Sequence, residues 1–552
     1  MRALPLIIVV GGDDLAVRVC EELCSTRGHD VVLLWDAGDG LAHRAEAIGA
    51  AFVCAKPNDY ESLRQCDVER AASIMPVSPD DRLNLQVALK ARDLNGRIRI
   101  VLRQFNQTLG RKIEQNVANC TAISPAAHAA ATYAAAALDS TSFYALQFPD
   151  VEGELVAFSE RLSLQFGIDD MTPAEAERRR NFRIVSVNGH SLYNRDTPLH
   201  RRDRVVVCSS VAALRYQRSV DRRSIWRRRL QTTYDEMLRS LSRTEPVLLR
   251  ILVAGLIVYF ASSLYFMAVL HISFLAASYF VAETMTTVGY GDITPTRGGV
   301  VAVVFSILLM FAGVAISGVF IATIAAALTR AQQKQLHGLR RIHAQGHVVL
   351  CGAGNVGMRV IEFLLRLRHH VVVVEQNPNS VLMELARDRR IDLLTGDATS
   401  DEVMEFCDLR NARAFVAITD SDTVNLEAAL GARVENSRLP VVMRMGDPEF
   451  ARSVGRNFAL TVTFSTTELT APTIAGLSRF RGTRGRVTFD DETYSIAERV
   501  QRDPGRPPVV PGALPLFVLR EGNLTPMSDF AEVRPQDRLL YLIPLSQFRE
   551  EK

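Results

Sequence analysis

Seven residues near the middle of the chain have the types and spacing of an ion-coordinating loop: Thr286-Thr287-Val288-Gly289-Tyr290-Gly291-Asp292. A dehydrated cation must be held by oxygens that replace its hydration shell, and backbone carbonyls can supply them when successive residues point at one axis. Gly289 and Gly291 alternate with Val288 and Tyr290, which permits backbone angles that other residues resist. We therefore expect a filter over Thr287–Gly291, with the cation bound by the carbonyls of Thr287, Val288, Gly289 and Tyr290.

Apolar segments flank this loop on both sides. Residues 251–270 carry no charge, and residues 300–328 form a second, longer apolar run, so each is long enough to cross a bilayer. Basic residues lie before the first run and after the second, which predicts a multi-pass protein of the cell membrane with both termini cytoplasmic. Within the connecting loop, residues 272–285 are too apolar for a solvated connector, so we predict a short re-entrant pore helix and the filter over residues 273–292.

Four further residues of this segment are candidates for supporting roles. Glu283 precedes the filter and Asp292 follows it. A protonated Glu283 hydrogen-bonded to Asp292 behind the filter would hold the loop rigid. Gly313 and Gly318 lie in the second apolar run and are candidate hinges of a gating helix, and close helix packing through small residues is an equally good explanation of both.

The segments before and after the apolar region follow one pattern. β-Branched apolar runs alternate with helical patterns, which is typical of an α/β doubly wound, Rossmann-like sheet. A constant shift of 341 residues superimposes identical residues of the two segments: Gly11 on Gly352, Arg18 on Arg359, Asn84 on Asn425, Arg103 on Arg444 and Ser124 on Ser465. Such a shift indicates a duplicated domain. Each copy ends in a β-rich tail, which we expect to form a small α+β subdomain.

The second copy carries a dinucleotide-binding fingerprint in the turn between a predicted strand and a helix. The glycines of this turn would allow a tight bend, close approach of a pyrophosphate and helix–strand packing, and the helix N-terminus attracts phosphates. Glu375, about twenty residues on, can accept hydrogen bonds from a ribose, and Asp397 lies near the end of the next strand. Capping of strand ends is the alternative role of these two acids. The predicted nucleotide-binding residues are Gly352, Gly354, Asn355, Val356, Gly357, Glu375 and Asp397.

The first copy departs from this fingerprint at the same place. Its turn reads Gly11-Gly12-Asp13-Asp14, so an acid replaces the middle glycine where a phosphate would approach. Lys56 stands at the position that Asp397 has in the second copy. We expect the first copy to bind this type of nucleotide poorly or not at all.

Composition limits the partners. A net charge of +3 gives no argument for nucleic acid, and the eight cysteines lack the spacing of a zinc site. Positive charge is concentrated in residues 213–245, where Trp226, Leu230 and Tyr234 recur at helical spacing. This pattern predicts a basic amphipathic helix at the lipid headgroups, with a solvated linker helix as the alternative. The expected domains are 1–140 and 141–212 for the two lobes of the first copy, 213–245 for the linker helix, 246–330 for the pore domain, 331–345 for a second linker, and 346–480 and 481–552 for the lobes of the second copy.

At TVGYG, set between two apolar spans, the chain resembles the two-transmembrane-helix bacterial K⁺ channels, whose filters carry this sequence. Glu283–Thr287 resembles the stretch before the filter in the pH-gated bacterial members, and Gly313 matches the usual hinge. Residues 346–552 resemble the regulator-of-K⁺-conductance domain (RCK, KTN or TrkA type), and residues 4–210 resemble its degenerate form. The resemblance implies a K⁺-selective homotetramer in the lipid membrane beneath a ring of eight regulator domains.

Two departures from the family pattern bear on the ligand. Many family channels place both regulator domains after the pore, whereas one precedes it here, which leaves the assembly of the ring open. Calcium-gated relatives have acidic residues after the fifth strand, but residues 441–445 read VVMRM, so that calcium site looks absent. The retained glycine turn favours NAD(H) or an adenine nucleotide as the gating ligand.

The leading hypothesis is a K⁺-selective channel, not an enzyme, that a cytosolic nucleotide gates. A membrane-tethered NAD-dependent oxidoreductase is one alternative, because the fingerprint permits it, although the sequence shows no substrate domain with a convergent acid–base set. A subunit of a K⁺ uptake transporter is the other. By resemblance, those pores carry four degenerate filter repeats in one chain, whereas this chain has one intact filter.

Overall fold

A computed structural model gives the structure of the chain. It describes residues 4–25, 28–36, 39–148, 155–191, 195–211, 246–336, 342, 344–388, 390–447, 449–451, 453–454, 462–478, 480, 482–505, 508, 510–527 and 532–547. The predicted basic helix at 213–245 lies outside the described residues. The chain divides into two units, which we call the two-copy unit (Met1–Arg218 with Arg340–Lys552) and the helical unit (Ser219–Leu339).

The first copy is built on a six-stranded parallel sheet with the strand order β3-β2-β1-β4-β5-β6. Its central strand is buried throughout Ile7–Val10, as the continuous β-branched run predicts. The strands are β1 Leu6–Val10, β2 Asp30–Trp35, β3 Ala51–Cys54, β4 Ser73–Pro76, β5 Arg99–Arg103 and β6 Cys120–Ile123. The helices are α1 Asp14–Ser25, α2 Asp39–Ala47, α3 Tyr60–Gln65, α4 Asp81–Leu94, α5 Gln107–Asn116 and α6 Pro125–Leu138.

The second copy repeats this sheet with the order β13-β12-β11-β14-β15-β16. Its strands are β11 Val348–Cys351, β12 Val371–Glu375, β13 Ile391–Thr395, β14 Ala414–Ala417, β15 Val441–Arg444 and β16 Val462–Phe464. Its helices are α14 Asn355–Arg366, α15 Ser380–Leu385, α16 Asp401–Phe406, α17 Asp422–Glu435 and α19 Thr466–Leu477. The predicted pair of doubly wound sheets is therefore confirmed.

Equivalent residues of the two copies make equivalent bonds. The buried Asn84 amide donates to the carbonyls of Ser78 and Arg103 (2.7 and 3.1 Å). Asn425, 341 residues later, donates in the same way to the carbonyls of Thr419 and Arg444 (both 3.1 Å). In each copy, one asparagine thus joins the loop after the fourth strand to the end of the fifth.

The β-rich tails form two antiparallel sheets that share one core. Phe158 and Phe489 stack across it with ring centroids 6.4 Å apart. The first tail has strand order β7-β8-β10-β9 and the second β17-β18-β21-β19-β20. Their elements are β7 Ser142–Gln147, β8 Leu155–Leu162, α7 Ser163–Phe166, α8 Pro173–Arg180, β9 Phe182–Val187 and β10 Arg204–Ser210, then β17 Thr483–Phe489, β18 Glu492–Val500, β19 Leu514–Arg520, β20 Asn523–Pro526, β21 Arg538–Pro544 and η3 Leu545–Gln547.

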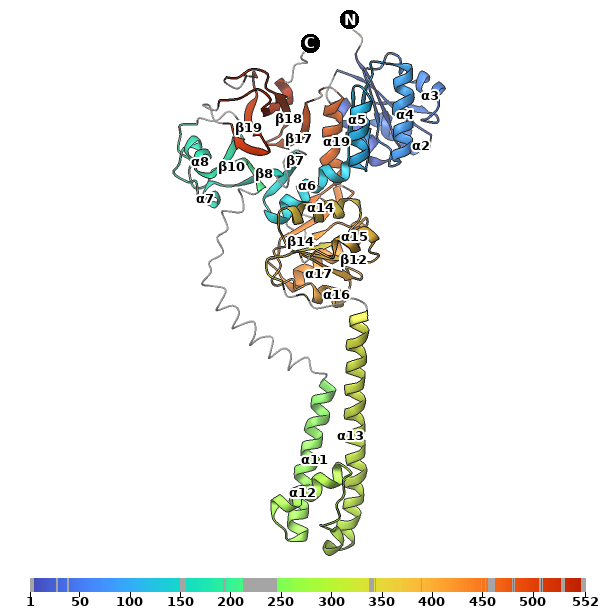
Figure 1. Cartoon of the computed structure of the whole chain (residues 1–552), viewed down its shortest axis with the longest axis vertical. Coiled ribbons are helices and arrows are strands. Elements are labelled where there is room, and N and C mark those ends of the chain that lie inside the picture. The colour runs from blue at the N-terminus through green and yellow to red at the C-terminus, as the bar shows by residue number, and fades with distance from the viewer. Residues whose placement is uncertain are drawn as a thin grey trace. The chain divides into compact units, whose positions relative to one another are not determined.

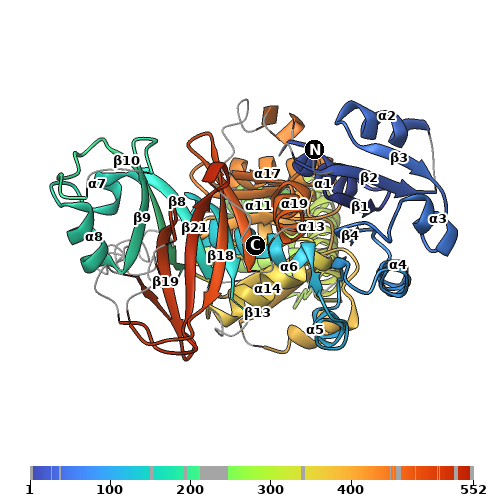
Figure 2. The same cartoon turned by 90° about the horizontal axis from the view of Figure 1, so that it is seen from above.

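The last helix of each sheet packs on the other copy (Figures 1 and 2). Helix α6 lies beside α14, and its alanines share a core with β11 and β14 of the second copy. In return, Ala471, Ile474 and Ala475 of α19 join the core of β1 and α1 in the first copy. At the edge of the second sheet, the Tyr133 hydroxyl of α6 donates to the Phe464 carbonyl (2.8 Å). The two copies therefore fold as one body.

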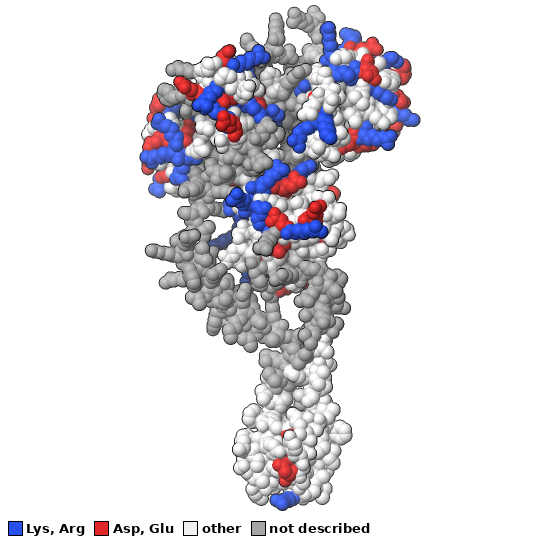
Figure 3. Space-filling model, viewed as in Figure 1, with Lys and Arg blue, Asp and Glu red and all other residues white. Residues whose placement is uncertain are grey.

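The helical unit contains α11 (Pro246–Leu270), α12 (Phe274–Met285), η2 (Pro295–Gly298) and α13 (Gly299–Leu336). Two stretches, Val253–Leu270 and Pro295–Ala322, are long and apolar enough to cross a membrane by length and composition. Figure 3 shows that the described surface of this unit is almost free of charge. Its small core centres on Phe266, Phe280 and Val281, which join the two long helices to α12.

We predict that Tyr133→Phe destabilises the two-copy unit. The substitution removes a buried hydrogen bond, and the Phe464 carbonyl keeps its bond from the Met445 amide (2.9 Å), so the expected cost is about 0.5–1.5 kcal/mol. The matched control is Tyr60→Phe, because the Tyr60 hydroxyl binds Asp93 at the exposed surface. Thermal unfolding of both purified variants in detergent measures the difference. Equal melting temperatures for the two variants would contradict this role of the crossover contact.

Candidate functional site

The structure places the predicted filter directly after α12. The Ser273 side chain caps this helix by accepting from the Ala276 amide, and the helix ends at Met285. The Glu283 carbonyl then accepts from the amides of Val288 and Gly289 (2.9 and 3.3 Å), which ties the first turn of the filter to the helix end. The loop therefore leaves the C-terminal, negative end of the helix dipole, where a cation is favoured.

Alternate residues of the filter adopt the left-handed conformation. Thr287, Gly289 and Gly291 have φ of 64°, 56° and 77°, and Val288 and Tyr290 between them are not left-handed. Alternation of right- and left-handed residues turns successive amides toward one side of the backbone and successive carbonyls toward the other. The two glycines adopt this conformation without steric cost, and Thr287 is the residue that carries a Cβ at such an angle.

The predicted supporting carboxylates lie close to a tyrosine of α12. Glu283 is 5% exposed, and its Oε2 has no hydrogen-bond partner among the described residues. The phenol of Tyr279 interacts with the side chains of both Glu283 and Asp292. The Tyr279 ring also stacks on Tyr290, with centroids 6.4 Å apart. Direct pairing of Glu283 with Asp292 stays a prediction, and Tyr279, which the sequence analysis did not consider, joins the group.

Gly313 touches the filter's supporting helix. A Cβ at this position would lie 2.7 Å from the Cα and carbonyl oxygen of Met285, whereas a Cβ at Gly318 would meet nothing within 4 Å. Helix α13 runs through both glycines without interruption. Close packing thus accounts for Gly313, and the hinge role of Gly313 and Gly318 stays a prediction.

The glycine turn of the second copy has the geometry of a phosphate cradle. Gly352 has φ of 94°, and a Cβ at Gly357 would lie 2.0 Å from the Gly352 carbonyl oxygen, so both positions require glycine. Gly354 is the N-cap of α14, and a Cβ there would meet nothing within 4 Å. The first-turn amides of α14, including those of Asn355 and Val356, point away from intrahelical partners. Gly352 and Gly357 thus leave no room for a side chain, whereas the space beside Gly354 is open to a ligand.

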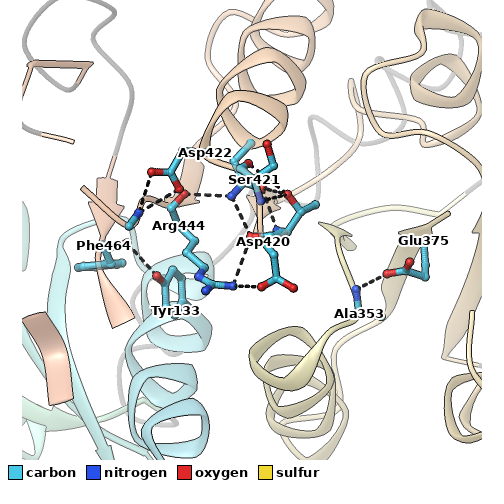
Figure 4. Close-up of polar contacts among 11 residues, drawn as sticks. Tyr133, Ala353, Glu375, Asp420, Ser421, Asp422, Arg444 and Phe464 are labelled. Atoms are coloured by element: carbon cyan, nitrogen blue, oxygen red, sulfur yellow. Dashed lines mark hydrogen bonds and ion pairs between the residues drawn. The ribbon is translucent and has the colours of Figure 1, made fainter. Parts of the chain in front are cut away.

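The two predicted acids bind backbone groups near the turn. Glu375 Oε2 accepts from the Ala353 amide (2.6 Å), as Figure 4 shows, and its Oε1 accepts from the Asn377 amide (3.0 Å). Asp397 Oδ1 accepts from the amide and hydroxyl of Thr399 (both 2.9 Å), and these bonds lower the pKa of its carboxyl below the ordinary value. Glu375 therefore borders the cradle, and Asp397 caps its own turn, as the alternative explanation supposes.

Two charged residues that the sequence analysis did not assign to this site lie at the ends of β14 and β15 (Figure 4). Arg444 donates from Nη1 to Asp420 Oδ1 (2.6 Å) and to the Thr419 carbonyl (3.3 Å). The Asp420 side chain is 91% exposed, so this ion pair is open to solvent on the side of the acid. Because the carboxyl ends of parallel strands carry the ligands in doubly wound sheets, their position at the strand ends was the available signal.

The first copy fills the same region with its own side chains. A Cβ added at Gly12 would lie 2.2 Å from the Trp35 indole nitrogen, so this ring covers the turn. Asp13, at the position of Gly354, pairs with Arg103 (2.6 Å), which is 11% exposed. Arg103 thus binds an acid inside the turn of the first copy, whereas the equivalent Arg444 binds an exposed acid in the second copy. This arrangement supports the expectation that the first copy binds nucleotide poorly.

Two protein families match separate parts of the chain. The TrkA-N domain matches residues 7–125 and again residues 348–465, and the ion channel family matches residues 247–330. The overall fold is similar to the solved GsuK channel, with a TM-score of 0.51 and 14% identity over 99% of this chain and 78% of that chain. The GsuK channel bound to NAD gives the same TM-score with 15% identity, over 99% and 78% of the two chains.

The matches to curated relatives cover shorter parts of this chain. Potassium channel protein 1 of Methanocaldococcus jannaschii is 27% identical over 181 residues, which are 32% of this chain and 54% of that protein. The voltage-gated potassium channel Kch of Escherichia coli is 27% identical over 179 residues, 32% of this chain and 42% of that protein. The matched segments thus span about half of these relatives or less.

We predict opposite consequences for two neighbouring glycines. Gly357→Ala forces a methyl group against the Gly352 carbonyl and destabilises the second copy by about 2 kcal/mol or more. Gly354→Ala leaves the melting temperature unchanged, because its Cβ enters open space, but weakens nucleotide binding. Thermal unfolding and calorimetric titration with NAD⁺ separate the two effects. A Gly357→Ala protein as stable as the parent would disprove the described turn geometry.

A second prediction concerns the acid behind the filter. Glu283→Ala removes the buried carboxyl that faces Tyr279, so K⁺ current through the reconstituted protein should decay faster during a sustained pulse. Glu283→Gln retains a hydrogen-bonding group of the same size and serves as the control, with decay closer to that of the parent. Identical decay in all three proteins would remove Glu283 from any supporting role.

Proposed function

Because the chain carries two TrkA-N domains and an ion-channel domain between them, we propose that it is a K⁺-selective channel of the cell membrane that a nucleotide gates. Two apolar helices and an uncharged surface support the membrane location, and the basic flanks of the helices favour cytoplasmic termini. The potassium-channel names of the curated relatives point to K⁺ as the permeant ion.

The observation that carries the pore proposal is the alternating backbone of Thr287, Gly289 and Gly291 at the end of α12. In this conformation the carbonyls of Thr287, Val288, Gly289 and Tyr290 can form successive rings of oxygen ligands. Transfer of K⁺ from water into such rings costs little free energy, since the carbonyls replace the hydration shell that the ion gives up. Asp292 would concentrate cations beyond the filter.

One chain supplies only part of such a pore. Val288 and Tyr290 are 53% and 73% exposed, and large apolar residues of α13 such as Phe311 (73%) are open as well. Apolar area of this size is normally covered by lipid or by protein. We propose that four copies surround one axis, so that their filters face each other and Tyr290 packs against neighbouring subunits.

The proposed gating ligand is NAD(H) or an adenine nucleotide bound to the second copy. Its pyrophosphate would lie over Gly354 against the first-turn amides of α14, where the dipole and unpaired amides attract anions. Glu375 would accept hydrogen bonds from a ribose hydroxyl through the lone pairs that Ala353 and Asn377 leave free. The solved GsuK channel bound to NAD lends support to a nucleotide on this fold.

The route from ligand to pore runs through the segment after α13. Residues of this segment bind the second copy through two backbone hydrogen bonds. The Ile342 amide donates to the Phe406 carbonyl (3.2 Å), and the Gly346 amide donates to the Asn411 carbonyl (2.9 Å). Ile342 is buried, so a shift of the second copy moves this anchor with it. A nucleotide changes gating only through its different affinity for the two arrangements of the unit.

The proposal predicts that Gly354→Asp abolishes the response of K⁺ flux to nucleotide. Aspartate is a good N-cap and its Cβ has room, so the fold is retained while its charge repels phosphate. We would measure K⁺ flux in liposomes with NAD⁺, NADH, ATP and ADP in turn. Gly431→Asp, which adds the same charge at an open position of α17, is the control and keeps the parent's response.

Two results would each reject one part of the proposal, the pore or the gating site. Absence of K⁺ flux from correctly folded protein under every condition would reject the pore. A conducting pore that none of the four nucleotides affects would reject the gating site. NADH oxidation by the purified protein with an added acceptor would instead favour the oxidoreductase alternative.

A further inference from the structure

A cavity lies in the two-copy unit, and no residue of the glycine turn lines it. Its volume is about 870 Å³, and both copies contribute to its walls. Gln107 and Arg111 come from α5 and His128 from α6, while Arg366 ends α14 and Arg484 lies on β17. Figures 1 and 2 show α5, α6, α14 and α19 meeting in this region. The cavity is large enough for a ligand of nucleotide size.

The lining carries an excess of positive charge. Three arginines (Arg111, Arg366 and Arg484) face the cavity with one carboxylate, Glu114. Arg484 shares Glu498 with Arg538, whereas Arg111 and Arg366 have no ion-pair partner among the described residues. Their guanidinium groups are therefore available to an anion. Arginine suits phosphate in particular, because its planar fork can donate two parallel hydrogen bonds.

A partly buried histidine adds no charge to this set. His128 Nε2 lies 3.2 Å from both the Tyr144 and the Thr473 hydroxyls. Burial lowers the pKa of His128 to about 4, so the ring is neutral at neutral pH. The N-terminus of α6 also opens here, since its cap Ser124 and first-turn Ala127 line the cavity. The helix dipole thus acts in the same direction as the arginines.

The remaining lining suits the organic part of such an anion. Ile123, Leu146 and Leu477 provide apolar surface between the arginines. Gln104 is 2% exposed, and its amide oxygen has no hydrogen-bond partner among the described residues although its nitrogen binds Asp81. Buried amide oxygens are normally paired, so this acceptor favours a ligand that also carries hydrogen-bond donors.

We propose that this cavity binds a phosphorylated organic molecule of nucleotide size, as a site separate from the glycine turn. The two sites lie at the two ends of one helix, because α14 has Gly354 as its N-cap and ends at Arg366. Because α6 packs along α14, a ligand that draws Arg366 toward Arg111 and Arg484 also acts on the contact between the copies. The cavity is thus a second regulatory site, whose existence does not require the pore proposal.

The test uses the full-length protein in detergent, with Gly354→Asp in the background so that the glycine turn is closed to phosphate. Radiolabelled ATP and pyrophosphate are the probes, measured by equilibrium dialysis. We expect saturable ATP binding in this background and at least a tenfold weaker affinity after Arg111→Gln with Arg366→Gln, since each removes charge-assisted hydrogen bonds. Pyrophosphate should bind more weakly than ATP, because it lacks the organic part.

The control variant is Arg82→Gln with Arg387→Gln, which removes one exposed arginine from each copy outside the cavity. It should bind ATP as the background protein does. Equal loss in both double variants, or no saturable ATP binding in the background, would overturn the proposal. Titration of the parent protein with NAD⁺ distinguishes the two sites. A loss of NAD⁺ binding that is seen only in Gly354→Asp assigns that binding to the glycine turn. A loss of ATP binding that is seen only in the cavity variant assigns that binding to the second site.

Discussion

The architecture of the two-copy unit depends on the burial of α6 against the other copy. This alanine-rich helix is buried on nearly all sides, and it packs between the second sheet and the tail of its own copy. Alanine lets the backbones approach closely, and Tyr133 fixes the edge of the second sheet through one hydrogen bond. Since α19 makes the reciprocal contact, neither sheet can move without displacing a helix of the other. A movement of either sheet would therefore be transmitted to the other copy.

Within this joint body the two sheets have diverged in electrostatics and kept their topology. The second copy leaves Gly354 open and pairs Arg444 with an exposed acid, whereas the first copy places Asp13 in the turn beneath Trp35. A partly buried ion pair and an indole ring occupy the region that phosphate would need. The turn of the first copy is thus filled by its own side chains, whereas the turn of the second copy is open at Gly354. The cavity at Arg366 lies apart from both turns and is lined by residues of both copies.

Sequence patterns predicted the features that local chemistry determines. The alternation of β-branched and helical segments predicted the sheets, and the 341-residue shift predicted that the second repeats the first. The glycine spacing predicted a turn in which Gly352 and Gly357 have no room for a side chain. The exchange of α6 and α19 was not predicted, because no periodicity states which sheet a helix covers. The cavity was missed for the same reason, because its lining joins residues that lie far apart in the chain. Tyr279 and Arg444 have nearer partners, but their contacts depend on how the filter loop and the strand ends fold back. Asp397 binds Thr399 of its own turn through Oδ1, and its role toward a ligand stays a prediction.

The central claim is that one chain joins a K⁺ filter to a nucleotide-responsive pair of sheets. Single-channel recording in planar bilayers tests it most directly, with K⁺ on one side, Na⁺ on the other and NAD⁺ or ADP added to each side in turn. The account predicts currents that reverse near the K⁺ equilibrium potential and an open probability that changes when nucleotide is added to one side only. Currents without K⁺ selectivity, or selective currents whose open probability neither nucleotide changes, would contradict it.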